Sequence, residues 1–275
     1  MAGKVWTENH ERDYKGFIEG NFDIVNKKGE LVPFIFNSIQ QKYYEDWTCS
    51  DIILKARQEG FSSLITAIFT ADFLLLDNSY SVIVADIEEN ASGLLDKVKL
   101  YIKSYEQRAK IKIKLKYDSR YELFFPFNNS RFVIGTAKNV EFGRSKTITN
   151  LHCSEVAFFP NIEKIIAGAG QAVVEGGKKI FETTANGFND FKTFYDDAKS
   201  GLSGYNAMFF RASDFYSAEF LAGKKAELRR LYAQEYPETD IEAFITSGEC
   251  YFDKNSLGEH LKLVREPIKN LQLAA

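Results

Sequence analysis

The sequence has few of the residues that mark extracellular, metal-binding or modular proteins. Its 275 residues include only three cysteines, Cys49, Cys153 and Cys250, which are far apart and form no CxxC pair. We therefore expect reduced thiols in a cytoplasm and no zinc site. Only five prolines occur, and no Ser/Gly-rich linker divides the chain. A single elaborated domain is the simplest interpretation.

Long apolar runs are also missing, and so is an excess of positive charge. The chain has no run of 18 apolar residues, and the N-terminal segment MAGKVWTENHERDY lacks an apolar secretory core. We expect no membrane span and no signal peptide. The formal net charge is −3, so the overall charge does not indicate a nucleic-acid partner, and any basic surface must be local.

What the sequence does contain is a set of short apolar runs that alternate with helical patterns. Alternation of this kind predicts an α/β fold with a mainly parallel central sheet flanked by helices. A hairpin is expected over 21–37 and a helix over 40–47. Further strands are expected at 51–56, 81–86, 121–125, 131–137, 147–153, 178–184 and 207–212. Helices are expected between them, including one over the segment IEKIIAGAGQAVV.

From about residue 214 the pattern becomes helical and polar. We therefore divide the chain into a core at 1–213, which includes the N-terminal hairpin, and a small helical subdomain at 214–275. Residues 97–116 are rich in lysine with interleaved tyrosines. This stretch is either a contact to DNA phosphates or a solvated helix face leading into an edge strand.

A candidate phosphate loop lies between the strand at 51–56 and the helix that follows it. Main-chain N–H groups at a helix N-terminus attract anions, and the loop pattern GxxxxGK followed by Ser or Thr exploits this. Gly60 and Ser62 match the pattern, whereas Lys55 replaces the first glycine and Phe61 replaces the lysine. The candidate nucleotide-contacting residues of the loop are Lys55, Ala56, Arg57, Gln58, Glu59, Gly60, Phe61, Ser62 and Ser63.

Because Phe61 replaces the lysine of the loop pattern, another residue has to supply the positive charge. Some cation has to meet the negative charge that develops on the phosphates during transfer, and either Lys55 or Arg57 could supply it. The Ser62 hydroxyl is the candidate ligand for Mg²⁺, although a serine there could also be a plain helix N-cap.

A second candidate is the carboxylate of Glu155, which directly follows the apolar strand at 147–153. Acidic residues at the carboxyl ends of buried strands lie in the crevice where α/β folds bind ligands. Such a carboxylate can orient the water that attacks a γ-phosphate. Ser154 stands where an aspartate usually holds the metal through water, so we expect Ser154 near the metal, without the charge of an aspartate.

Four segments in this order resemble the ATPase half of the large terminase subunit of tailed double-stranded DNA phages. KARQEGFSS resembles its variant Walker A motif, and LHCSEVAFFPN resembles its Walker B region. ETTANG resembles its coupling motif, and EYPETDIEAFITSGECYF resembles the segment that closes the ATPase half. The resemblance covers about residues 31–252 and implies a P-loop NTPase.

The resemblance implies roles for further residues. PFIFNSIQ resembles the element that reads adenine, with Gln40 as the contact to the base. Thr184 and Asn186 would sense the γ-phosphate. Arg144 lies where some ring-forming members carry an arginine finger that acts on a neighbouring subunit. Glu155 would be the catalytic carboxylate, assisted by Arg57 or Arg144.

The resemblance also implies cofactors, partners and a location. These are ATP and Mg²⁺, double-stranded DNA, the portal protein of the procapsid, the small terminase subunit and a homo-oligomeric ring. The protein would work in the host cytoplasm while docked on the procapsid. The chain leaves no room after the closing segment for the family's nuclease fold, so nuclease activity is not expected in this chain.

Two other functions stay open from the sequence. One is another P-loop nucleic-acid motor, such as a helicase, although no QxxGRxGR-type motif is present. The other is a packaging module whose nucleotide site has degenerated, which the residues Phe61 and Ser154 favour.

Overall fold

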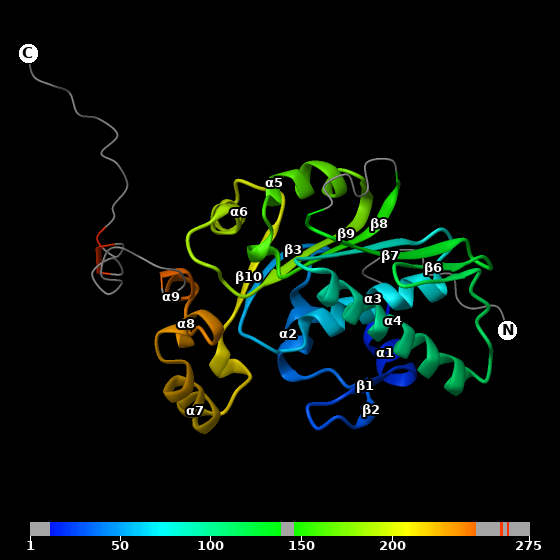
Figure 1. Cartoon of the computed structure of the whole chain (residues 1–275), viewed down its shortest axis with the longest axis horizontal. Helices are drawn as coiled ribbons and strands as arrows, with labels where there is room; N and C mark the ends of the chain where they lie inside the picture. The colour runs from blue at the N-terminus through cyan, green and yellow to red at the C-terminus, as the bar shows by residue number, and fades with distance from the viewer. Residues whose placement is uncertain (1–11, 139–145, 246–258, 261–262, 264–275) are drawn as a thin grey trace, which may run out of the picture.

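A computed structural model of the chain describes residues 12–138, 146–245, 259, 260 and 263. Within these residues an eight-stranded sheet forms the centre of the molecule, in the order β10-β3-β9-β8-β4-β7-β6-β5 (Figure 1). Neighbouring strands from β10 to β7 pair in parallel, and β6 and β5 add an antiparallel edge. The strands of the sheet are β3 (Ser50–Lys55), β4 (Tyr80–Ala85), β5 (Tyr117–Asp118), β6 (Glu122–Phe125), β7 (Ser130–Thr136), β8 (Ile148–Ser154), β9 (Val173–Thr183) and β10 (Asn206–Phe210).

Helices cover both faces of this sheet, as the alternating pattern predicts. In Figure 1 the helices α1 to α4 lie below the sheet, and α5 and α6 lie above it. Each face has its own core of buried apolar side chains, which is the layered arrangement expected for a parallel sheet. The helices are α1 (Tyr14–Asn21), α2 (Ser38–Asp46), α3 (Phe61–Leu75), α4 (Glu88–Ala109), α5 (Ile162–Ile165) and α6 (Asp190–Lys199).

The N-terminal hairpin is confirmed as the antiparallel pair β1 (Asp23–Val25) and β2 (Leu31–Pro33). The helix predicted from residue 40 is confirmed as α2, which begins two residues earlier. Asn37 caps it, and Gln40 completes a reciprocal capping box, so the first turn has its free N–H groups satisfied. Helix α1 was not predicted from the sequence.

The helix predicted over IEKIIAGAGQAVV is wrong in its second half. Helix α5 ends at Ile165, a π-helical turn η3 (Ile166–Gly170) follows, and Val173 already belongs to β9. Two glycines in the sequence IAGAG weaken a regular helix. Val173 is β-branched and pairs with Ile148 of the neighbouring strand, so tertiary pairing overrides the helical pattern.

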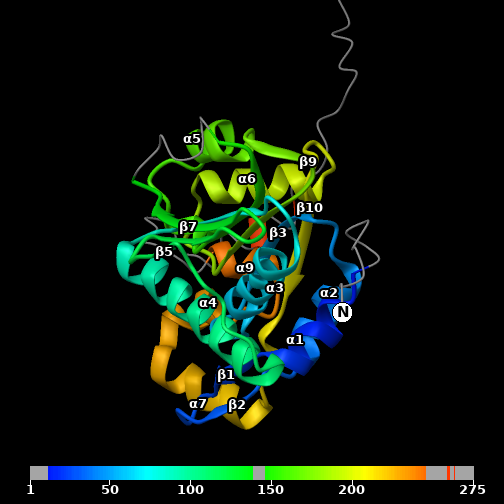
Figure 2. The same cartoon turned by 90° about the vertical axis from the view of Figure 1, so that its right-hand side faces the viewer.

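A group of short helices follows β10 and lies at the left of Figure 1. Figures 1 and 2 both show α7 at the same end of the molecule as the hairpin of β1 and β2. The last helix, α9, packs against the core domain, because Phe244 contacts the rings of Phe191 and Tyr195 on α6. The elements are η4 (Ala212–Asp214), α7 (Ala218–Leu228), η5 (Arg229–Leu231), α8 (Tyr232–Glu235) and α9 (Asp240–Ile245).

The boundary at residue 214 stays a prediction. Ala56 of the phosphate loop lies in one buried cluster with Ala212, Tyr216, Leu221 and Tyr236, so the small helices share a core with the loop. Among the described residues, no helix has both the length and the apolar character needed to cross a bilayer.

Candidate active site

The predicted site residues follow three strands that lie side by side in the sheet. The order β3-β9-β8 places the candidate phosphate loop, the ETTANG turn and Glu155 at the carboxyl ends of adjacent parallel strands. Because parallel strands end at the same edge, the three segments converge there. The sheet brings together residues that are about a hundred positions apart in the sequence.

The phosphate loop has the shape that its glycine predicts. Gly60 has φ 89° and is the N-cap of α3. This left-handed conformation suits glycine, and a Cβ here would lie 2.8 Å from the Gln40 Nε2. The loop is held from α2, because Gln40 Nε2 donates to the Gly60 carbonyl at 2.8 Å and Asn37 Nδ2 donates to the Glu59 carbonyl at 3.0 Å. The free N–H groups of the first turn of α3 are thus fixed in place.

Gln40 is therefore part of the support of the loop. Its Oε1 accepts from the Asn37 backbone N–H at 3.0 Å, and its Nε2 donates to Gly60. It also lines the cleft beside the loop. Reading of adenine by Gln40 stays a prediction, and a base could bind there only beside these existing contacts.

Lys55 is buried at the end of β3 between two carboxylates. Its ammonium lies 3.5 Å from Glu155 Oε1 and 3.1 Å from Glu182 Oε2. Burial alone would lower the pKa of Lys55, but the charges of Glu155 and Glu182 outweigh it and hold the pKa above its usual value. Lys55 is thus a full positive charge at neutral pH.

Arg57 has a different environment. Its side chain is 61% exposed, and its Nη1 lies 3.2 Å from Glu235 Oε2 on α8. The Arg57 N–H donates to the Glu235 carbonyl, and Tyr216 OH donates to the Arg57 carbonyl at 2.6 Å. Lys55 is therefore placed at the centre of the site, and Arg57 joins the loop to the small helices.

Glu182 is a residue of the site that the sequence analysis did not single out. It is 0% exposed near the end of β9, and its Oε1 accepts from Ser62 Oγ at 2.7 Å and from Ser154 Oγ at 2.6 Å. Burial raises the pKa of a carboxyl group, but here Lys55 and the hydrogen bonds from His152 and Ser154 outweigh burial and hold the Glu182 pKa far below its usual value. A charged residue within the predicted central strand at 178–184 is the signal that could have revealed it, because buried charges are almost always paired.

Glu155 directly follows β8 and has a left-handed conformation, with φ 58°. Its side chain is 30% exposed, and Thr183 Oγ1 lies 3.4 Å from its Oε2. Burial raises the pKa of Glu155, and the charge of Glu182 adds to this, while Lys55 opposes it. A carboxylate with a raised pKa is a better proton acceptor near neutrality.

The remaining predicted residues of the loop and the turn are placed as follows. Phe61 packs its ring against Phe210 and Tyr43, so its side chain belongs to the core and only its main chain faces the loop. Asn186 Nδ2 donates to the Ala157 carbonyl at 3.3 Å, tying the turn after β9 to the segment after Glu155. Thr184 lines a cleft beside Glu155. Arg144 lies outside the described residues.

Two clefts meet at this edge of the sheet. One, of about 850 Å³, lies between the β1–β2 hairpin and the phosphate loop. The other, of about 480 Å³, lies between the start of α4 and the ends of β8 and β9. Arg57, Ser62, Lys97 and Glu155 line both. Volumes of this size are typical of sites for small-molecule ligands.

The predicted metal site can be tested on the donors present. Ser62 and Ser154, the two predicted metal residues, both bond to the same carboxylate oxygen of Glu182. Hydroxyl and carboxylate oxygens are the donors that Mg²⁺ prefers. Among the described residues no group of three His, Cys, Asp or Glu side chains could hold a metal by itself. This donor set fits an ion bound together with phosphate oxygens, as Mg²⁺ usually is.

Comparison with solved structures identifies the fold. The chain superposes on the large terminase ATPase domain of Thermus phage P74-26 with a TM-score of 0.61 at 15% identity, covering 74% of this chain and 93% of that one. It superposes on the HK97 bacteriophage large terminase with a TM-score of 0.65 at 16% identity, covering 87% of this chain and 56% of that one. The large terminase of a thermophilic bacteriophage, in complex with ATP-gamma-S, gives a TM-score of 0.52 at 15% identity, with coverage of 70% and 49%.

The fold is therefore that of a large terminase ATPase domain, as the sequence resemblance implies. The chain spans about half the length of the HK97 terminase and of the terminase from the thermophilic bacteriophage. No protein-family model matches the sequence, and no curated protein matches it.

Proposed function

We propose that this chain is an ATP-hydrolysing motor domain that drives double-stranded DNA into a viral capsid. The observation that carries the proposal is the contact between Lys55 and Glu155, whose charged groups lie 3.5 Å apart at the mouth of the phosphate loop. A cation for the phosphates and a carboxylate for the attacking water are thus already beside each other. The terminase fold and the complex of the thermophilic bacteriophage's terminase with ATP-gamma-S support a nucleotide as the ligand.

The chain's own groups divide the work of hydrolysis. Main-chain N–H groups at the start of α3 bind the phosphates, and the Lys55 ammonium balances the charge that grows during transfer. Glu155 orients the attacking water and accepts its proton. Ser62 and Ser154, with Glu182 behind them, would hold Mg²⁺, which supplies charge neutralisation at the phosphate oxygens.

Coupling to movement would run through two sets of contacts. The turn Thr183–Gly187 follows Glu182 and touches Glu155 through Thr183, so Thr184 and Asn186 are placed to respond to loss of the γ-phosphate. Arg57 joins the phosphate loop to α8 through Glu235. A change at the phosphates could therefore reach the small helices directly.

The partners and location follow from the packaging role and belong to the same proposal. They are double-stranded DNA, the portal protein, the small terminase subunit and a homo-oligomeric ring, with the protein docked on the procapsid in the host cytoplasm. Arg144, if it acts as a finger, would act on a neighbouring subunit, where an arginine can stabilise transition-state charge.

The degenerate-module alternative loses its two supports. Phe61 replaces the loop lysine, but Lys55 brings an ammonium to the loop from the end of β3. Ser154 replaces an aspartate, but it bonds to the Glu182 carboxylate at 2.6 Å. Both missing charges are supplied by other residues. No observation favours a helicase.

Glu155→Ala tests the proposal. Hydrolysis of Mg-ATP should fall by at least about 10²-fold, because a positioned general base contributes about that much or more. The dissociation constant for ADP, measured by calorimetry, should change by less than about threefold. Glu163→Gln is the matched control, because Glu163 is an exposed carboxylate on α5. Unchanged hydrolysis in the Glu155 variant, or absence of nucleotide binding by the unmodified protein, would overturn the proposal.

A further inference from the structure

Lys97 on α4 is a positive charge that faces the active site. Its ammonium donates to Ser63 Oγ at 2.8 Å, and among the described residues no acidic group lies within ion-pair distance of it. Burial lowers the pKa of Lys97, which the charge of Lys55 reinforces and that of Glu182 opposes. A cation that is removed from water without a counter-ion is costly, so its position calls for an anion.

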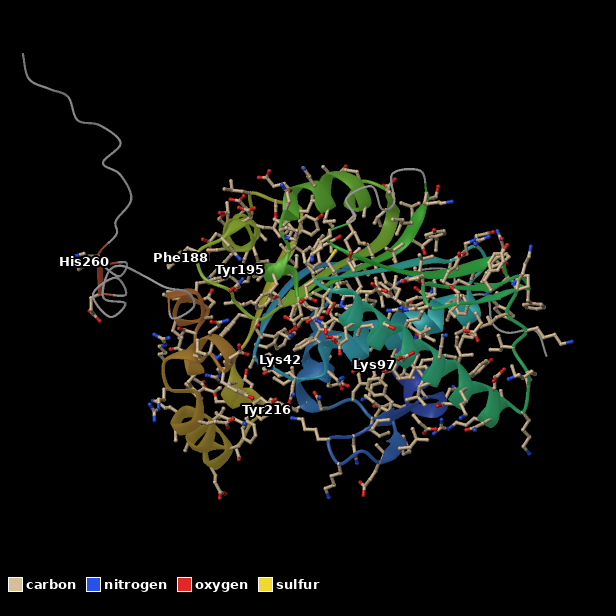
Figure 3. All side chains as sticks on the ribbon, viewed as in Figure 1. Lys42, Lys97, Phe188, Tyr195, Tyr216 and His260 are labelled. Carbon is tan, nitrogen blue, oxygen red and sulfur yellow. The ribbon has the colours of Figure 1, made fainter. Side chains whose placement is uncertain are left out.

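The position of Lys97 is at the junction of the two clefts. It lines both of them, together with Ser62, Glu155 and Arg57. Figure 3 shows Lys97 near the middle of the molecule. It lies on α4, which packs against α3, the helix that follows the phosphate loop. The lysine-rich stretch at 97–116 therefore begins with a residue that turns toward the loop.

Two other cations, Lys55 and Arg57, lie at the phosphate loop, and each of them has a carboxylate partner. Lys55 is balanced by Glu155 and Glu182, and Arg57 is balanced by Glu235. The loop position that usually carries a lysine is Phe61, whose ring is packed in the core. Among the described residues that line both clefts, Arg57 and Lys97 are the cations, and Lys97 is the one without an ion pair.

We infer that the Lys97 ammonium binds the terminal phosphate of the bound nucleoside triphosphate. This inference rests on the proposed function. The terminal phosphate is favoured over the inner ones because the wall common to both clefts contains Glu155, the residue that has to face the attacked phosphorus. Ser63 holds the ammonium in place until the phosphate arrives.

Lys97→Met tests the inference, with Lys103→Met as the control, because Lys103 is an exposed lysine on the same helix. Calorimetry with Mg²⁺ should show ATP-gamma-S binding weakened at least about tenfold in the Lys97 variant, since charge-assisted hydrogen bonds are worth about 1.5–3 kcal/mol. ADP binding should change by less than about threefold. The control should bind both nucleotides like the unmodified protein.

Thermal unfolding separates this role from a structural one. Lys97→Met removes a partly buried charge that has one hydroxyl partner, so the melting temperature without nucleotide should stay the same or rise. An equal loss of affinity for both nucleotides, no loss for either, or a lower melting temperature in the variant would overturn the inference while leaving the proposed function intact. If the unmodified protein binds neither nucleotide, the proposed function itself fails.

Discussion

Strand β9 carries two buried ion pairs, one at its middle and one near its carboxyl end, and the two pairs differ in their surroundings. At the middle of the strand, Lys178 Nζ lies 2.7 Å from Asp72 Oδ2, and Tyr14 OH donates to Asp72 Oδ1 at 2.7 Å. At the carboxyl end, Glu182 meets Lys55 at 3.1 Å. The first cluster lies between α1 and α3, whereas the second opens onto both clefts through Ser62 and Glu155.

This difference in surroundings indicates that one ion pair of the strand serves stability and the other serves activity. A buried pair that is fully enclosed can only hold the fold together, and removing one partner leaves an unpaired charge. A buried pair beside a cleft can exchange its partners for a ligand. We therefore expect substitutions at the cluster of Lys178 and Asp72 to affect folding and those at the cluster of Glu182 and Lys55 to affect catalysis.

The largest expected effect is on folding, in Asp72→Asn. This change removes the carboxylate charge that pairs with the buried Lys178 and with Arg12, and it should reduce the free energy of unfolding by about 3–5 kcal/mol. Urea denaturation measures the loss, and ADP affinity measured below the transition should be unchanged. Asp196→Asn, which removes an exposed pair with Lys192, should cost less than about 0.5 kcal/mol. A stable Asp72 variant that no longer binds nucleotide would contradict the assignment of this cluster to folding.

The next effect is on turnover, in the matched pair Lys55→Met and Arg57→Met. Loss of the central ammonium should reduce Mg-ATP hydrolysis by at least about 10²-fold, since one preorganised charge at a transition state is worth that much. The exposed Arg57 should matter less, with a loss below about tenfold. Steady-state phosphate release measures both. The reverse order would assign the phosphate role to Arg57.

A smaller effect concerns pH, in Glu59→Gln. Burial raises the pKa of Glu59 to about 8, with Lys55 opposing the shift. The folded protein therefore holds this proton more tightly than the unfolded chain. The stabilisation is complete below the unfolded pKa, near 4.5, and is lost as the pH rises through about 8.

The glutamine side chain does not ionise. The free energy of unfolding of the variant should therefore increase relative to that of the unmodified protein by up to about 1.4 kcal/mol per pH unit across this window. Denaturation without nucleotide at pH 5, 6.5 and 8 measures the difference. Parallel stability curves for the two proteins would show that Glu59 is ionised in the folded state at all three values.

The smallest effect is expected at the hairpin, in Lys27→Met. The Lys27 ammonium lies 4.8 Å from the centre of the Tyr216 ring and 5.4 Å from that of Phe215. Exposed cation–π contacts are worth about 0.5–1 kcal/mol, so nucleotide affinity should fall about two- to fivefold as the wall of the larger cleft loosens. Lys28→Met, at the exposed neighbouring position, should change nothing. Equal losses in both variants would mean that general charge, and not this contact, sets affinity.

Much of the fold could be predicted from the sequence because buried parallel strands are continuous apolar runs. The segment from Ser50 through Gly60 into α3 is strand, loop and helix, as expected. Glu155 could be found because it directly follows such a run. Glu182 and Lys97 could not be assigned in the same way, because their partners come from other elements. Their roles depend on β9 lying between β3 and β8, and on α4 lying beside α3, which no local pattern encodes.

From Lys179 to Glu182, strand β9 pairs with β3 on one side and with β8 on the other, and Lys178, at the middle of the strand, is held by a buried ion pair with Asp72. Such a strand cannot slide along its axis without breaking many bonds at once. If the charge near Glu182 changes when a phosphate leaves, the segment that can change its conformation most easily is the short turn after Thr183. Under the proposed function, movement after each turnover would therefore occur at this turn while the sheet stays fixed.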